Sequence, residues 1–217
     1  MPTVSFSEWV EEVFNHPVSG PEWYWGNDFD ERWNALGLLD SLTVEYMTHL
    51  FLAPDCLHRY SLEQVAQGIW FLIGESSPAQ SAHILLKSDV PLQQRIGCVD
   101  AMTNFFRAFV ALASQGMADE QRNPFHTAVY MWWDIFPTYG NPSNGGNPLD
   151  CACLNTMAAV LKVPSELCQL SALHGLNHWH LHYPDKVETI VDEFLKTNGL
   201  TPRIVEYAAT ARSGCAL

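Results

Sequence analysis

PLDCACLNTMAAVLKVPSELCQLSALHGLNHWHLHYPDKVETIVDEFLKTNGLTPRIVEYAATAR, residues 148–212, is the stretch that decides the fold. A proline introduces each of its apolar-periodic segments, as at the first turn of a helix, where the N–H that proline lacks has no partner in any case. The connections between segments are very short, so consecutive helices are expected to pack as antiparallel neighbours. The stretch therefore predicts four helices, over 148–162, 165–181, 184–197 and 202–212.

The same helix signals recur toward the N-terminus. Ser5-x-x-Glu8 and Ser61-x-x-Gln64 are capping boxes, and apolar residues at helical spacing follow each of them. No segment sustains the alternation of polar and apolar residues that is typical of a strand. The predicted fold class is therefore all-α, with about nine or ten helices. The predicted helices outside 148–212 are 5–15, 28–39, 40–53, one from 61, 77–87, 91–114 and 124–136.

Part of this stretch resembles a known repeat unit. Residues 171–195, SALHGLNHWHLHYPDKVETIVDEFL, are similar to the helix–turn–helix unit of HEAT-like repeat proteins. The matching features are the small residues Ala172 and Gly175, the apolar residues Leu173 and Leu176, and the turn at Pro184. The resemblance covers about 148–212. It implies antiparallel helix pairs stacked as an α-α superhelix, whose usual role is to present a surface to a protein partner.

Length and composition limit the classes of protein. The chain has 217 residues, 47% of them hydrophobic, which predicts a single helical domain over 1–217, and any sub-division would fall near 115–123. Eleven Lys and Arg stand against 24 Asp and Glu, and no segment gathers basic residues. We therefore expect neither nucleic acid nor a membrane as a partner. The N-terminus lacks the pattern of a signal peptide, so the predicted location is cytoplasmic.

Four of the nine histidines fall close together, at His174, His178, His180 and His182. On a helix His174 and His178 lie one turn apart on one face, whereas His180 points away and His182 lies at the helix end. This spacing suits two imidazoles that bind one Zn²⁺ or a similar divalent metal.

A carboxylate from another helix would complete such a metal site, and three candidates lie in the two following helices, Asp192, Glu188 and Glu206. Two alternatives stay open. Both imidazoles could be buried, neutral and hydrogen-bonded within the core, or they could transfer protons.

Aromatic residues form two further groups near predicted loops. Such residues can line a pocket for a peptide, an apolar ligand or a sugar, and the alternative is packing in the core. The predicted ligand or partner surface consists of Trp23, Trp25, Trp132, Trp133, Tyr139, His180 and His182.

No complete catalytic set is present, so the leading prediction is a non-catalytic helical scaffold that binds a protein or peptide partner. No cofactor is expected in that case. The alternative is a metal-dependent, hydrolase-type enzyme that holds a divalent metal through His174 and His178. A third class is a homo-oligomeric structural subunit, which would bury a large apolar surface between its copies.

Overall fold

The computed structural model describes residues 4–74, 76–116, 123–142 and 146–215. Helices make up 66% of the chain, and the described residues contain no strand. The predicted all-α class is therefore confirmed. The predicted sub-division near 115–123 falls largely on 117–122, which lie outside the described residues.

Eleven α-helices lie in the described ranges. They are α1 (Phe6–Phe14), α2 (Phe29–Ala35), α3 (Asp40–Leu52), α4 (Leu62–Ile73), α5 (Leu92–Phe105), α6 (Ala111–Ala113), α7 (Pro124–Tyr130), α8 (Pro148–Val160), α9 (Glu166–Trp179), α10 (Pro184–Phe194) and α11 (Pro202–Ala211). Between them lie three 3₁₀ segments, Trp23–Trp25, Pro54–Arg59 and Ser81–Leu86, and one π-helical segment, Phe106–Val110.

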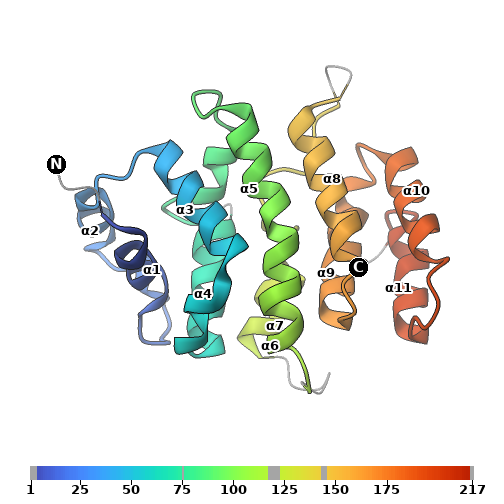
Figure 1. Cartoon of the computed structure of the whole chain (residues 1–217), viewed down its shortest axis with the longest axis horizontal. Coiled ribbons are helices and arrows are strands. Elements are labelled where there is room, and N and C mark those ends of the chain that lie inside the picture. The colour runs from blue at the N-terminus through green and yellow to red at the C-terminus, as the bar shows by residue number, and fades with distance from the viewer. Residues whose placement is uncertain (1–3, 75, 117–122, 143–145, 216–217) are drawn as a thin grey trace.

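Consecutive helices alternate between two layers (Figure 1). In one layer α3 packs against α5, α5 against α8, and α8 against α10. In the other layer α1 packs against α4, α4 against α7, α7 against α9, and α9 against α11. The buried side chains of both layers form one continuous hydrophobic core. The short connections after α8 place α9, α10 and α11 each in the layer opposite its predecessor, as expected for antiparallel neighbours.

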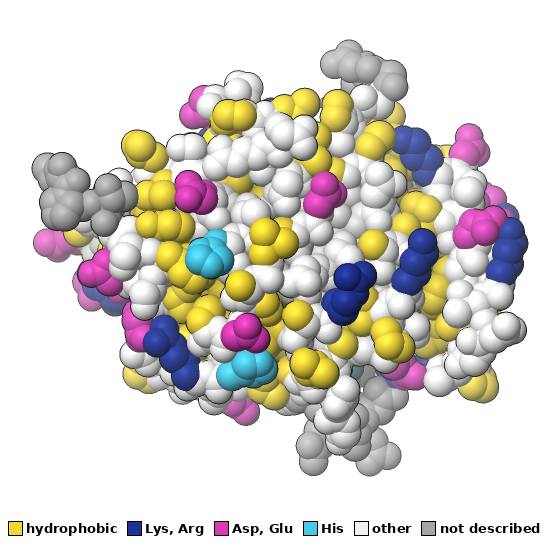
Figure 2. Space-filling model, in the orientation of Figure 1, with side chains coloured by type: hydrophobic (Ala, Val, Ile, Leu, Met, Phe, Trp, Pro, Cys, Tyr) yellow, Lys and Arg dark blue, Asp and Glu magenta, His cyan; other side chains and the backbone are white. Residues whose placement is uncertain are grey.

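The long helical run Leu92–Ala113 crosses the middle of the molecule. By length and composition alone it would be able to span a membrane. In the structure it packs between α3 and α8, and side chains such as Val99, Met102 and Phe105 are fully buried in the core. Figure 2 shows one face of the molecule, on which charged side chains are scattered among apolar and other side chains rather than gathered into one patch.

The predicted helix 28–39 ends at Ala35, and two further predicted helices differ more strongly from the structure. The segment 77–87 forms a 3₁₀ helix over Ser81–Leu86 only, because Gln80 adopts a left-handed backbone (φ 49°) that no continuous helix contains. The segment 124–136 leaves the helix after Tyr130 and continues as turns to Phe136. The adjacent Trp132 and Trp133 lie in these turns, and both are fully buried.

A buried carboxylate fastens the loop before α8. Asp150, in the first turn of α8, is 1% exposed. Its Oδ2 accepts a hydrogen bond from the Tyr183 hydroxyl at 2.6 Å and another from the Asn141 backbone N–H at 2.7 Å. Burial and the hydrogen bond with Asp150 raise the pKa of Tyr183, so this phenol keeps its proton. The loop that carries Tyr139 is thereby tied to α8.

Candidate functional site

Two small residues on α9 bring the chain that follows α7 close to this helix. Ser171 is fully buried, and its hydroxyl donates a hydrogen bond to the Val129 carbonyl at 2.6 Å. One turn later, Gly175 lies so near Trp133 that an added Cβ would be 2.5 Å from the Trp133 Cβ. His174 and His178 lie beside these residues on the same helix, so they face the turn after α7.

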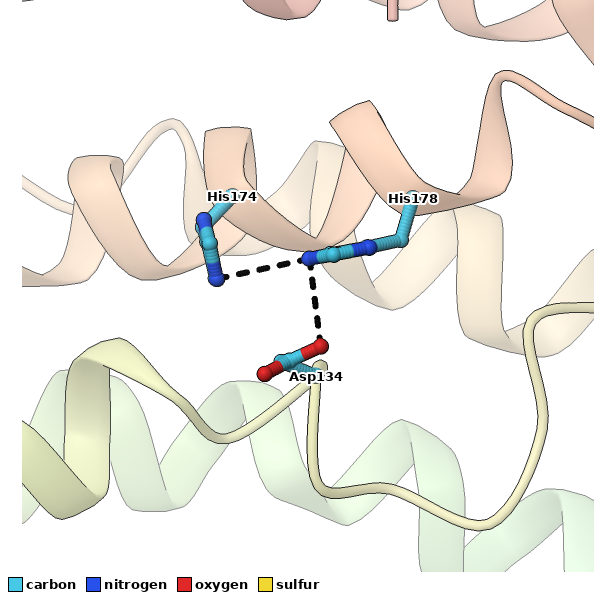
Figure 3. Close-up of side chains that lie close together, drawn as sticks. All are labelled: Asp134, His174 and His178. Carbon is cyan, nitrogen blue, oxygen red and sulfur yellow. Dashed lines mark hydrogen bonds and ion pairs between the residues drawn. The ribbon is translucent and has the colours of Figure 1, made fainter. Parts of the chain in front are cut away.

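That turn presents Asp134 to the two histidines (Figure 3). The backbone N–H of Asp134 donates to the Met131 carbonyl at 2.9 Å, which closes the turn. The three side chains point toward one another from α9 and from the turn. A helix that continued through 136 would not contain this turn, so its early end creates the cluster.

The ligand atoms of the cluster lie close together. His178 Nε2 is 3.2 Å from Asp134 Oδ1 and 3.4 Å from His174 Nε2. All three potential ligand atoms lie within 4.8 Å of one another. His174 is 7% exposed, whereas the side chains of His178 and Asp134 are 31% and 25% exposed. The cluster is therefore anchored in the core on one side and reachable from solvent on the other.

Two tyrosines, Tyr207 and Tyr130, contact the His174 side chain. His174 Nδ1 pairs with the Tyr207 hydroxyl of α11 at 2.9 Å, and that hydroxyl pairs with the Tyr130 hydroxyl at 2.7 Å. The Tyr130 ring also stacks on the His174 ring. Burial and the pairing with Tyr130 raise the pKa of Tyr207, which stays protonated. Nδ1 is thereby occupied, and Nε2 of His174 faces His178.

Tyr139 supports the other two members of the cluster. Its hydroxyl donates to the Asp134 backbone carbonyl at 2.7 Å, and its ring stacks on His178. The loop residue thus fixes the turn that carries Asp134 and covers one face of the His178 ring.

The buried histidine of the cluster is neutral at physiological pH. Burial lowers the pKa of His174 to about 4, and the positive charge of a protonated His178 would lower it further, while Asp134 acts in the opposite direction. A neutral imidazole keeps a free lone pair on one nitrogen, which is the form that binds a metal.

This shift predicts how the stability of the metal-free protein depends on pH. Above pH 6.5 the His174 imidazole is neutral in both states and contributes no pH dependence. Between pH 6.5 and 4 the His174 imidazole is protonated in the unfolded chain and stays neutral in the folded chain. The free energy of unfolding therefore falls by about 3 kcal/mol as the pH falls through this range. Below pH 4 both states carry the proton and this contribution becomes level.

Urea unfolding at a series of pH values, in the presence of a chelator, measures this effect. We expect His174→Gln to lose most of this pH dependence, and we expect His182→Gln, at an exposed position, to keep it. An unchanged slope in His174→Gln would show that other groups cause the acid sensitivity.

The observed spacing fits a tetrahedral metal ion. Zinc bonds of about 2.0–2.1 Å to nitrogen and oxygen place neighbouring ligand atoms about 3.3 Å apart around a tetrahedron. The two distances from His178 Nε2, 3.2 Å and 3.4 Å, match this separation. Two imidazoles and one carboxylate also form a ligand set that zinc and similar divalent metals accept. The third pair, His174 and Asp134, lies within 4.8 Å, so one ion held by all three residues would draw these two side chains closer together.

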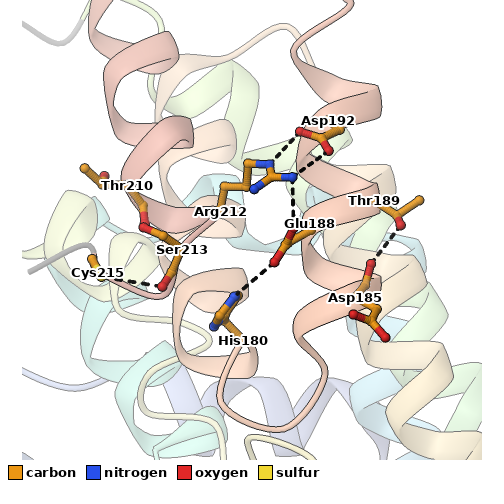
Figure 4. Close-up of polar contacts among 9 residues, drawn as sticks. All are labelled: His180, Asp185, Glu188, Thr189, Asp192, Thr210, Arg212, Ser213 and Cys215. Carbon is orange, nitrogen blue, oxygen red and sulfur yellow. Dashed lines mark hydrogen bonds and ion pairs between the residues drawn. The ribbon is translucent and has the colours of Figure 1, made fainter.

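Two of the three carboxylates expected to complete this site, Glu188 and Asp192, pair with Arg212 (Figure 4). Arg212 binds Asp192 through Nε and Nη2 at 2.7 Å and 3.0 Å, and it binds Glu188 Oε2 at 2.8 Å. These contacts fasten α11 to α10. Glu206 lies exposed on α11. In the structure the carboxylate that lies beside His178 is Asp134 rather than one of these three residues.

The other two histidines lie outside the cluster. His180 Nε2 is 3.8 Å from Glu188 Oε1, and the residue faces α10 rather than Asp134 (Figure 4). His182 follows the end of α9 and is exposed. The helical spacing thus correctly separates His174 and His178 from His180.

The predicted aromatic surface is divided between core and exterior. Trp132 and Trp133 are fully buried, so the expectation that they contact a partner is wrong. Trp23 is partly buried and stacks on His16 with ring centroids 3.8 Å apart. Trp25 remains 49% exposed. Only Trp25 among the four tryptophans therefore offers a largely open face.

Sequence reasoning missed Asp134, Tyr207 and Tyr130. Asp134 lies 40 and 44 positions before the two histidines, so no local spacing connects them. One weak signal is that Asp134 is the sole charged residue in the apolar run Tyr130–Pro137. A carboxylate in such a run needs a specific partner.

Comparison with known proteins adds no relative to this picture. No family model matches the chain, no curated protein matches it, and no solved structure matches it.

Proposed function

We propose that the protein binds one divalent metal ion, with Zn²⁺ as the first choice, through Asp134, His174 and His178. The single observation that carries the proposal is the convergence of these three ligand atoms within 4.8 Å. The Tyr207 hydroxyl on His174 Nδ1 adds support, because metal-binding histidines characteristically pair their second nitrogen with a hydrogen-bonding group.

The ligand count suggests the chemistry that this site would perform. Structural zinc sites use four protein ligands, whereas catalytic sites use three and leave a position for water or substrate. Three ligands converge here, and the exposed sides of Asp134 and His178 leave that position accessible. A metal-assisted hydrolase is therefore the enzyme class we propose, in which the bound ion would lower the pKa of a water molecule.

Metal content of the untagged protein tests this proposal. We expect one Zn²⁺ per chain after loading and dialysis, measured by elemental analysis. We expect His174→Ala, His178→Ala and Asp134→Ala each to weaken binding at least about tenfold, because each removes one of three ligands. Substitution with Co²⁺ provides a second readout, since a tetrahedral site gives an intense visible absorption band and an octahedral site gives only a weak one.

The chain offers matched controls for this experiment. His180→Ala and His182→Ala remove neighbouring histidines that lie outside the cluster, so they should bind metal like the unaltered chain. Circular dichroism confirms that each variant remains helical. Absence of stoichiometric metal from the unaltered chain, or equal loss in the control variants, would contradict the proposal.

A second candidate function rests on the alternation of helices. We propose that the layered pairs form a HEAT-like stack over about 148–212, which acts as a scaffold for a protein or peptide partner. Its support is the neighbour order α5–α8–α10 in one layer and α7–α9–α11 in the other. Two cavities of about 460 and 360 Å³ lie between α8 and α10 and share Thr189 and Ile190.

Affinity capture with the unaltered chain and with Ile190→Asp tests the scaffold candidate. A partner that binds at the two cavities between α8 and α10 should be retained by the unaltered chain and lost by Ile190→Asp. Equal recovery would place the partner elsewhere. Light scattering of the same samples measures whether the chain forms a homo-oligomer, the third class of function.

A further inference from the structure

A small aromatic pocket lies far along the chain from the histidine cluster, between the 3₁₀ segment Trp23–Trp25 and the end of α4. Its cavity has a volume of about 280 Å³ and is lined by Glu22, Tyr24, Trp25, Trp70, Ser76 and Ser77. Three of these six residues are aromatic. Tyr24 and Trp25 present rings whose centroids are 5.5 Å apart and whose planes are inclined at 59°. The pocket is therefore walled by inclined ring faces.

A buried polar atom of the pocket has no partner within the described part of the chain. Ser77 is 4% exposed, and its Oγ forms no hydrogen bond there. A buried hydroxyl without a partner costs free energy, so such groups are uncommon unless something else meets them. This observation is independent of the aromatic walls, and it leaves in the pocket wall a hydroxyl that a polar group of a ligand, such as a hydroxyl or carbonyl beside a cationic group, would meet.

The charge of the pocket selects the class of ligand. Glu22 is a carboxylate, and none of the six described lining residues is Lys or Arg. The chain as a whole carries a formal charge of −13. Burial, followed by the nearby Glu22 carboxylate, raises the pKa of Tyr24, so this ring stays neutral. Aromatic faces attract cations, and a carboxylate beside them reinforces that attraction. An apolar ligand would gain nothing from the negative charge.

We propose that this pocket binds a quaternary ammonium group between Tyr24, Trp25 and Trp70, with Glu22 balancing its charge. The cavity lies below the usual size range of drug-sized ligand pockets, which suits one compact cationic group rather than a whole chain segment. The group would belong to a small molecule such as choline or to the side chain of a trimethylated lysine. This proposal does not depend on the metal site.

Titration of the protein with choline, followed by NMR of the choline methyl protons, tests the proposal. Methyl groups held against ring faces shift upfield, so binding is visible even when it is weak. The comparison ligand is 3,3-dimethylbutan-1-ol, which has the shape of choline without its charge. We expect the neutral compound to bind at least about tenfold more weakly than choline.

Variants locate the effect in the pocket. Trp25→Ala removes a ring that is 49% exposed, so we expect the fold to survive and choline binding to weaken about tenfold. Glu22→Gln keeps the shape and should also weaken choline, while leaving the neutral compound unaffected. Leu181→Ala, at a 78% exposed position outside the pocket, should bind choline like the unaltered chain.

A parallel titration with an acetylated trimethyllysine amide distinguishes the two sources of the group, because the natural carrier should bind the more tightly. The proposal is overturned if neither cation binds, if the neutral compound binds as well as choline, or if Trp25→Ala leaves choline binding unchanged.

Discussion

Trp132→Ala is expected to lower the free energy of unfolding by about 3–5 kcal/mol. Trp132 is fully buried and packs against three phenylalanine rings, Phe51, Phe105 and Phe106, with centroids 5.2–5.8 Å away. These rings come from α3, from α5 and from the π-helical segment, so truncation would open a cavity at the junction of several elements. The loss combines the transfer free energy of the indole with the cost of that cavity.

Trp25→Ala provides the matched control, because Trp25 is 49% exposed. Its truncation should cost about 1 kcal/mol or less, since much of the indole already contacts water. Urea unfolding monitored by circular dichroism measures both variants. Equal losses in the two variants would contradict the distinction between a core tryptophan and a surface one.

Gly175→Ala is expected to lower the free energy of unfolding by about 3 kcal/mol. The new Cβ would lie 2.5 Å from the Trp133 Cβ and 2.8 Å from the Met157 Sδ. The Trp133 Cβ is attached directly to the backbone, so relief requires that α9 and the turn after α7 move apart. The same movement would separate Asp134 from the histidines, and we expect metal affinity to fall together with stability.

Gly97→Ala is the matched control for this substitution. Gly97 lies within α5, and an added Cβ would meet nothing within 4 Å. Alanine favours helix there, so stability should rise by about 0.5–1 kcal/mol. Thermal and urea unfolding compare the two variants. A Gly175→Ala protein as stable as the unaltered chain would show that the contact between α9 and Trp133 is looser than the structure indicates.

Capping boxes and prolines predict where many of the helices begin, because both act on neighbouring residues in the sequence. The Ser5 and Ser61 hydroxyls each accept the expected hydrogen bond from the N–H three residues later, and Glu8 and Gln64 complete both capping boxes. Pro148, Pro184 and Pro202 begin α8, α10 and α11 as predicted. Caps and prolines act within one turn, so a single sequence displays them.

The candidate site depends on tertiary structure, and sequence predicts only part of it. The pair His174 and His178 follows from helical spacing, whereas the partner Asp134 follows from a turn that the periodic pattern around Trp132 and Trp133 conceals. Two adjacent tryptophans on a helix point in different directions, so the pattern predicts that at least one of them packs in the core. The chain instead stops the helix at Tyr130 and buries both.

The position of Tyr207 has a consequence for the order in which the site is assembled during synthesis. Asp134, His174 and His178 all precede Tyr207 along the chain, and α11 carries the hydroxyl that occupies His174 Nδ1. The hydroxyl that pairs with His174 Nδ1 is therefore the last part of the cluster to be synthesised. The orientation of His174 is set when α11 docks on α9. The chain therefore contains all three ligand residues before it contains the hydroxyl that orients one of them.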